Sequence, residues 1–186
     1  MNKGFTLLET IIVIAITMIL SAVTLGYNRS NEKQIALYRD QAIIVGLINR
    51  AKSLALQKFN VENACAFGVH FESPRGFTIF ADKMSSESGK TVCKNISGVY
   101  QLNGTYDAGG EALTDEQTTF SLDNRLKFRV LTPPLNSDII FVPPEMETKT
   151  NPASDPFIIQ IETLDGSLCS SLEVGVGGQI TEGNCL

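Results

Sequence analysis

Hydrophobic and polar residues follow three patterns along the chain, and the first is a long apolar run. No charged residue lies between Thr10 and Asn28, and Glu9 is the only side chain from Phe5 to Asn28 that is charged at neutral pH. About 20 apolar residues suffice for a helix to cross the hydrocarbon core of a bilayer. The run is too long for the apolar part of a secretory signal peptide, and no Ala-x-Ala-like cleavage site follows it. The pattern therefore predicts a transmembrane helix over residues 5–28.

The second pattern is that of an amphipathic helix. Between residues 35 and 59 apolar side chains recur at intervals of three, four or seven, which places them on one face of an α-helix. These positions are Leu37, Ile44, Ile48, Ala51, Ala55 and Phe59. The chain has no proline before Pro74. We therefore expect a helical stalk over residues 29–59, with its apolar stripe packed against the rest of the protein.

The third pattern consists of short alternating runs and predicts a β-rich head over residues 60–186. Residues 64–72 and 77–82 alternate on either side of Ser73-Pro74-Arg75-Gly76, which is a hairpin signal. Further strands are predicted at 99–102, 118–122, 126–131, 139–142, 157–163, 168–175 and 179–181. Loops rich in Gly, Ser, Pro, Asn and Asp are predicted at 83–97, 103–117 and 143–156. The predicted fold class is α+β, a long N-terminal helix packed on a mostly antiparallel β head.

Charge is distributed unevenly over these segments. The net charge of the 186 residues is −5, but residues 27–59 carry six basic and two acidic side chains, or +4. Residues 60–186 carry eight basic and seventeen acidic side chains, or −9. Binding to nucleic acid relies on basic surfaces that release counterions. Although Lys83, Lys90 and Lys94 fall on one predicted loop, the head is therefore not expected to bind nucleic acid.

The four cysteines, Cys65, Cys93, Cys169 and Cys185, all lie in the predicted head. A hairpin folded about Gly177 would place Cys169 and Cys185 opposite each other, because each is eight residues from that centre. Cys65 and Cys93 then pair by elimination. Free buried thiols are the alternative, and the absence of a Cys-x-x-Cys pair argues against zinc. Disulfides require an oxidising compartment, so this pattern indicates export.

No pattern in the sequence indicates catalysis or a resident cofactor. His70 is the only histidine and lies among apolar neighbours on a predicted strand, which favours a structural role. Four acidic residues on one Gly-rich loop could bind calcium, but their spacing fits no calcium loop and favours a solvated surface. These residues are Asp107, Glu111, Asp115 and Glu116. The sequence therefore predicts no enzyme, no cofactor and no metal site.

Glu9 is the exceptional residue of the apolar run. A carboxylate at the centre of a membrane helix costs roughly 2.5 kcal/mol or more. The positive end of the helix dipole offsets only about 0.3–1 kcal/mol of this. Glu9 is therefore expected to be protonated, to reach the membrane interface or to meet a cationic partner.

The N-terminal residues also resemble a known processing signal. The segment resembles the signature of type IV prepilins and pseudopilins in three features: a short leader with Lys3, the run GFTLLE from Gly4 to Glu9, and the apolar segment behind it. The resemblance implies that a prepilin peptidase/methyltransferase removes residues 1–4 by cutting after Gly4 and then methylates Phe5. It also implies that Glu9 pairs with the N-terminal amine of a neighbouring subunit.

The family resemblance carries expectations about place and partners. It implies a single-pass protein of the inner (cytoplasmic) membrane with an exported head, which then enters a pilus or pseudopilus filament. The expected partners are other pilin or pseudopilin subunits, the prepilin peptidase, an inner-membrane assembly platform and the lipid bilayer.

Parts of the head resemble one subclass. Four segments are similar to the minor pseudopilins of the H class of type II secretion and to related minor pilins. They are the runs ACAFGVHF, INRAKSLALQ and SLEVGVGGQIT and the strand end Phe80-Ala81-Asp82. The prediction is thus a minor pilin or pseudopilin, a structural subunit assembled by helix packing. The alternative is a single-pass membrane-anchored extracytoplasmic binding or sensor domain whose start only mimics a prepilin.

Overall fold

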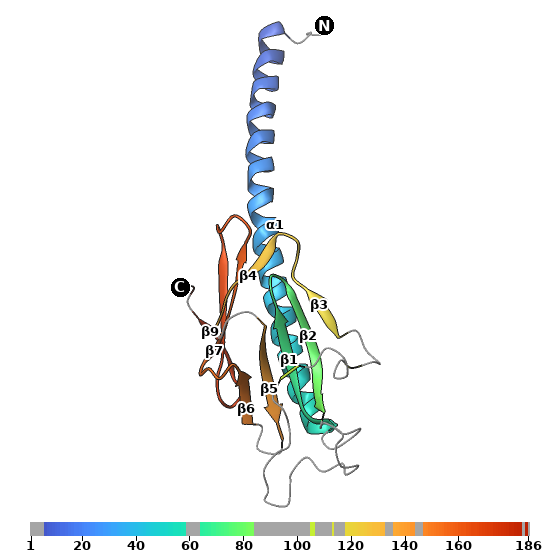
Figure 1. The fold of residues 1–186 in the computed structure, drawn as a ribbon. Coiled ribbons are helices and arrows are strands. Elements are labelled where there is room, and N and C mark those ends of the chain that lie inside the picture. The colour runs from blue at the N-terminus through green and yellow to red at the C-terminus, as the bar shows by residue number, and fades with distance from the viewer. Residues whose placement is uncertain are drawn as a thin grey trace, which may run out of the picture. The chain divides into compact units, whose positions relative to one another are not determined.

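The computed structural model describes residues 6–58, 64–83, 105–106, 113, 118–132, 136–143, 147–183 and 185, and of residues 24–30 and 130–132 only the backbone. By their internal contacts these residues form two compact units, 1–35 and 36–186, each treated separately below. The described elements are one helix and nine strands (Figure 1). The α+β class expected from the sequence is confirmed.

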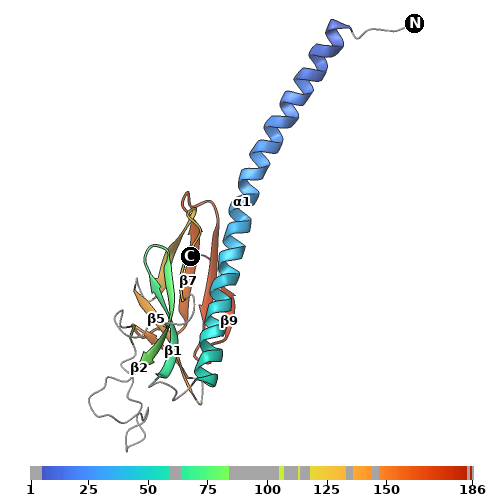
Figure 2. The ribbon, with the colours of Figure 1, turned by 90° about the vertical axis from the view of Figure 1, so that its right-hand side faces the viewer.

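The helix α1 runs from Leu7 to Gln57, close to the range expected from the apolar run and the amphipathic stripe. In the second unit the stripe is buried: Leu37, Ile44 and Ile48 are each at most 4% exposed. Ala51 and Ala55 are fully buried on the same face. The last predicted stripe residue, Phe59, lies outside the described residues. Figure 2 shows the strands on one side of this half of the helix.

Two antiparallel sheets pack against that helical face. The five-stranded sheet has the order β3-β2-β1-β5-β6 and the four-stranded sheet the order β4-β7-β8-β9. The strands of the first are β1 (Ala64–Glu72), β2 (Gly76–Lys83), β3 (Thr119–Ser121), β5 (Ser137–Val142) and β6 (Glu147–Asn151). Those of the second are β4 (Leu126–Thr132), β7 (Phe157–Thr163), β8 (Cys169–Val174) and β9 (Ile180–Gly183). Both sheets place an apolar face toward the helix, so they share one core.

Phenylalanine rings join the two sheets at the centre of this core. Phe71 on β1 is fully buried, and its ring centroid lies 5.7 Å from that of Phe157 on β7 and 5.8 Å from that of Phe128 on β4. Phe77 on β2 lies 6.4 Å from Phe71. Aromatic pairs at such distances contribute beyond the area that they bury. The centre of the head therefore depends on side chains from both sheets at once.

The opposite face of the five-stranded sheet carries a second, smaller apolar cluster. It consists of Ala66, Phe80, Ile140 and Val142, with Tyr106 packed against it. Gly68 belongs to this face, and a Cβ there would lie 2.5 Å from the carbonyl oxygen of Ile139 and 2.8 Å from the Phe80 ring. Only a residue without a side chain allows this close approach of ring and strand.

The prediction of a loop over residues 143–156 is wrong in part, because β6 lies within it. The strand has the sequence ETKTN and contains no apolar residue, so no alternation signals it. Backbone pairing defines it instead: β6 pairs with β5 from Val142↔Glu147 to Asp138↔Asn151, and the Thr148 N–H donates to Val176 O at 3.0 Å. The predicted strand 99–102 lies outside the described residues. The predicted loop 83–97 also lies outside them from residue 84 on, and so does the predicted loop 103–117 apart from residues 105–106 and 113.

A charged network ties the helix to the turn between β3 and β4. Asp40 is buried on the helix and accepts the backbone N–H of Asp123. Arg39 lies 2.8 Å from the Asp40 carboxylate and 3.2 Å from that of Asp123. Hydrogen bonds from the Arg125 side chain and backbone, with the charges of Arg125 and Arg39, lower the pKa of Asp123 from 3.8 to about 2. The buried Asp40 is thus satisfied by this turn.

This network predicts an acid-dependent loss of stability. Because the pKa of Asp123 is lower in the folded than in the unfolded chain, its stabilising contribution is present at neutral pH and is lost as the pH falls from about 5 toward 2. Since Arg39 and Arg125 are partly exposed, we expect this contribution to be about 1 kcal/mol. Urea unfolding of the full chain and of Asp123→Asn in detergent should therefore differ by this amount at pH 7. At pH 2.5 most of the difference should have gone; an equal difference at both pH values would contradict the assignment.

Candidate functional site

The start of α1 is a capped helix terminus built by the residues of the processing motif. The Glu9 N–H donates to the Thr6 hydroxyl oxygen at 3.3 Å, and the Thr10 N–H donates to Thr6 O at 3.2 Å. Thr6 thereby satisfies one of the first N–H groups that have no partner within the helix. Its spacing to Glu9 is that of a capping box. Reasoning from the sequence missed Thr6, although the Thr-x-x-Glu spacing signals it.

Glu9 lies in the first turn of the helix, where the positive end of the helix dipole favours a carboxylate. Its side chain is exposed and makes no ion pair with any other described residue. The expected cleavage and methylation positions, Gly4 and Phe5, lie outside the described residues. In the part that is described, the carboxylate thus occupies a favourable position and meets no cation.

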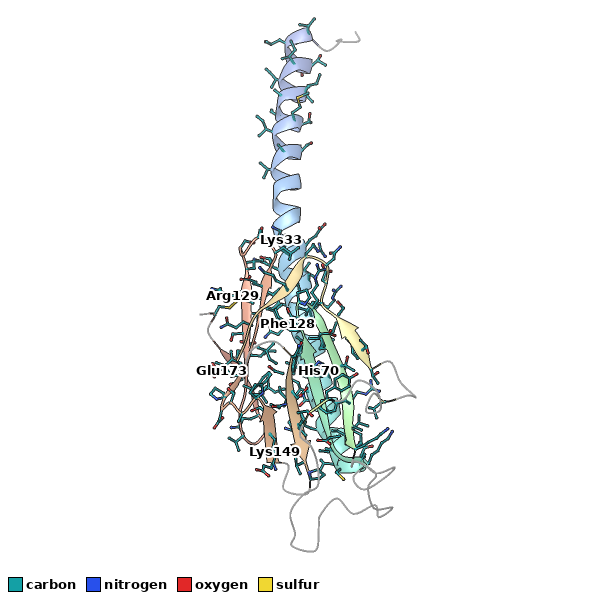
Figure 3. The ribbon with its side chains drawn as sticks, viewed as in Figure 1. Lys33, His70, Phe128, Arg129, Lys149 and Glu173 are labelled. Carbon is teal, nitrogen blue, oxygen red and sulfur yellow. A yellow bond between two sulfur atoms is a disulfide. The ribbon has the colours of Figure 1, made fainter. Side chains whose placement is uncertain are left out.

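The first part of α1 presents an apolar surface on every side. The large hydrophobic residues between Leu7, which is 79% exposed, and Val23 are all about half exposed or more. Figure 3 shows side chains that project from both sides of this part of the helix. The polar side chains among them are satisfied inside the helix: the Thr17 hydroxyl donates to Ile14 O at 2.9 Å and the Ser21 hydroxyl to Thr17 O at 2.7 Å. A helix that is apolar all round is typical of a segment buried in lipid or among other helices.

Among the described residues, no helical stretch is both long and apolar enough to cross a membrane. The predicted span 5–28 lies partly outside them, since Phe5 and the side chains of residues 24–28 are not described.

A disulfide closes the last hairpin of the head. β8 pairs with β9 from Val174↔Ile180 to Ser171↔Gly183, a register centred on residue 177. Cys169 and Cys185 are bonded, with their Cα atoms 6.2 Å apart. This is the pair that the hairpin argument expected. Cys65 is also disulfide-bonded, whereas Cys93 lies outside the described residues, so the pairing of these two stays a prediction.

His70 lies in a setting that fits a structural role. Its Nδ1 is 2.6 Å from Oδ1 of Asp138 on the neighbouring strand β5, and its ring lies 4.7 Å from that of Tyr106. The other oxygen of Asp138 accepts the Tyr106 N–H at 3.3 Å. The pair thus holds Tyr106 over the second apolar cluster.

The described residues hold no group of three or more side chains that could bind a metal ion. The acidic residues considered for calcium lie outside this part of the chain, so that possibility stays open there. They are Asp107, Glu111, Asp115 and Glu116. Of the three lysines considered for nucleic acid, Lys83 is described, and Lys90 and Lys94 are not.

Comparison with known proteins recognises the N-terminal segment. Residues 1–25 match the prokaryotic N-terminal methylation motif, the segment that the resemblance had singled out. No curated protein and no solved structure matches the chain. The motif is that of type IV pilins and pseudopilins, a structural and not an enzymatic class of proteins. The chain therefore has the N-terminus of a type IV pilin-like precursor, on an α+β fold consistent with a pilin.

Proposed function

We propose that this protein is a minor pilin or pseudopilin, a structural subunit that enters a type IV pilus or a type II secretion pseudopilus after leader cleavage and methylation. The observation that carries the proposal is the coincidence of three features at one terminus. The methylation motif covers residues 1–25, Glu9 lies in a capped first turn, and an all-round apolar surface follows it. A filament of packed helices uses all three features.

The proposal gives each part of the motif a role. A prepilin peptidase/methyltransferase cuts after Gly4, the new N-terminus is methylated Phe5, and Glu9 pairs with the N-terminal amine of a neighbouring subunit. The apolar helix holds the subunit in the inner membrane until an assembly platform extracts it. The disulfides of the head support export, because such bonds persist in oxidising compartments.

Two features of the head favour the minor H-class type over the membrane-anchored binding or sensor domain. The motifs ACAFGVHF and SLEVGVGGQIT, which resemble that class, form β1 and the β8–β9 hairpin. The buried helical stripe also gives the head and the helix one core, whereas a tethered sensor needs only a flexible connection to its anchor.

Mass spectrometry of the protein from a host with a prepilin peptidase tests the proposal. We expect a mature chain that begins at Phe5 and carries one methyl group on its N-terminus. Gly4→Leu is the matched control, since a bulky side chain at the cleavage position should leave an unprocessed chain in the membrane. An intact Met1 in the wild-type protein would support the anchored binding domain and refute the proposal.

A further inference from the structure

Few contacts hold the last strand of the head, β9, to the rest of the fold. The strand has four residues, is the outer strand of its sheet and pairs, among the described strands, with β8 alone. Thr181 and Glu182 are exposed, and of the β9 side chains that of Ile180 alone packs against the core, partly buried. Two strands that pair without further packing are barely stable in water, so β9 needs another support.

The Cys169–Cys185 disulfide supplies this support. Cys169 is the first residue of β8, and Cys185 follows the end of β9 at Gly183 by two residues. The bond therefore joins the two strands at the end away from their turn. A crosslink between residues 16 positions apart restricts the unfolded chain and so favours the paired strands. A short outer strand depends on such a bond more than a strand at the centre of a sheet does.

The bond is accessible from outside the folded head. Cys185 is exposed, Cys169 is partly buried, and both line an open pocket of about 320 Å³. By contrast, Cys65, which is also disulfide-bonded, is 1% exposed. Thiol–disulfide exchange requires that a thiolate reach a sulfur atom of the bond. We propose that the Cys169–Cys185 bond is an exchange site at which an external dithiol releases β9 from the folded head, a property that the proposed function does not require.

The exchange takes two steps and consumes one dithiol, of the kind that thiol–disulfide oxidoreductases carry in a Cys-x-x-Cys pair. One thiolate of the dithiol attacks Sγ of Cys185, the bond to Cys169 breaks, and Cys169 leaves as a thiolate that takes up a proton. The second thiol of the dithiol loses its proton and attacks its partner sulfur in the mixed disulfide, which releases Cys185 as a thiolate. The two cysteines have then gained two electrons and two protons, and the dithiol has become a disulfide.

Opening the bond changes the edge of the four-stranded sheet. β8 lies between β7 and β9, so the loss of β9 leaves the backbone groups on one side of β8 open to another strand. Leu172 and Val174 of β8 belong to the core of the head and stay packed without β9. The head therefore remains folded while one sheet edge changes from covered to open. The disulfide thus acts as a redox-dependent switch of this edge.

Thiol labelling of the full chain in detergent tests whether the bond opens in the folded head. The protein is incubated with the dithiol dithiothreitol, and free thiols are alkylated with iodoacetamide and located by mass spectrometry. We expect label on Cys169 and Cys185, whereas the buried Cys65 should stay unlabelled until denaturant is added. No label on Cys185, or label on Cys65 at the same rate, would overturn the proposal, because the second result means that the whole head unfolds.

Hydrogen exchange tests whether the bond controls β9. We expect reduction to speed the exchange of the β9 amides about a hundredfold and to leave those of β1, at the centre of its sheet, unchanged. The double variant Cys169→Ser/Cys185→Ser should show the fast exchange without reductant. Dithiothreitol should not change it further, although this variant keeps the bond of Cys65. Equal protection of β9 in both redox states, or a further effect of dithiothreitol on the variant, would overturn the proposal.

Discussion

Glu9→Leu is expected to remain membrane-inserted and to be cleaved after Gly4, yet to reduce assembly into filaments by at least about tenfold. The reason is that the proposed partner, the N-terminal amine of a neighbouring subunit, would lie in an apolar surrounding without its counter-charge. The substitution also makes the first turn of the helix more apolar, which favours insertion. Processing can be followed by the mobility of the chain, and assembly by the fraction sheared from cells.

Thr17→Leu is the matched control, because it makes the same apolar segment more hydrophobic while keeping Glu9. The Thr17 hydroxyl donates to Ile14 O of its own helix, and among the described residues it has no partner outside that helix. This variant should be processed and assembled as the wild type is. Normal assembly of Glu9→Leu, or an equal defect in both variants, would refute a pairing role of the carboxylate.

Phe71→Ala should lower the free energy of unfolding of the head by about 3–5 kcal/mol, because a large buried ring leaves a cavity that its neighbours cannot fill. Phe71 contacts rings from both sheets, so the loss weakens the packing of each sheet against the other. Denaturant unfolding of the full chain in detergent measures the effect.

Phe120→Ala provides the comparison for this substitution. Phe120 lies on the edge strand β3, is only partly buried and stacks on Phe77 at 5.9 Å. The same loss of a ring should therefore cost less than half as much as at Phe71. Equal losses at the two positions would contradict the central place of Phe71.

Where apolar residues define an element, its limits could be predicted from the sequence. Residues 64–72 and 157–163 are strands with the predicted bounds, because runs such as FIIQIET are rich in the β-branched and aromatic residues that a buried sheet requires. The predicted strand 139–142 begins two residues later than β5, because Ser137 and Asp138 are polar and do not continue its apolar run. In the structure Asp138 is buried because it is paired with His70.

In the candidate site, too, contacts between residues close in the sequence could be predicted, whereas contacts between distant residues could not. The Thr6 cap and the cysteine pair 169–185 depend on short spacings, and both could be derived from the sequence, although the first was missed. The contact of Asp40 with Asp123 joins residues 83 positions apart, and no local sequence pattern indicates such a pair.

β6 contains no apolar residue, so the sequence pattern did not predict it, and the same composition affects how this strand can pair with other molecules. β6 is the outer strand of its sheet, and the backbone groups of an outer strand can pair with a strand of another molecule unless they are bonded within the chain, as the Thr148 N–H is to Val176 O. Charged side chains such as Lys149 on such a strand disfavour that pairing. In the proposed filament, heads at high local concentration would then stand side by side without aggregating through their sheets, and specific contacts alone would set their spacing.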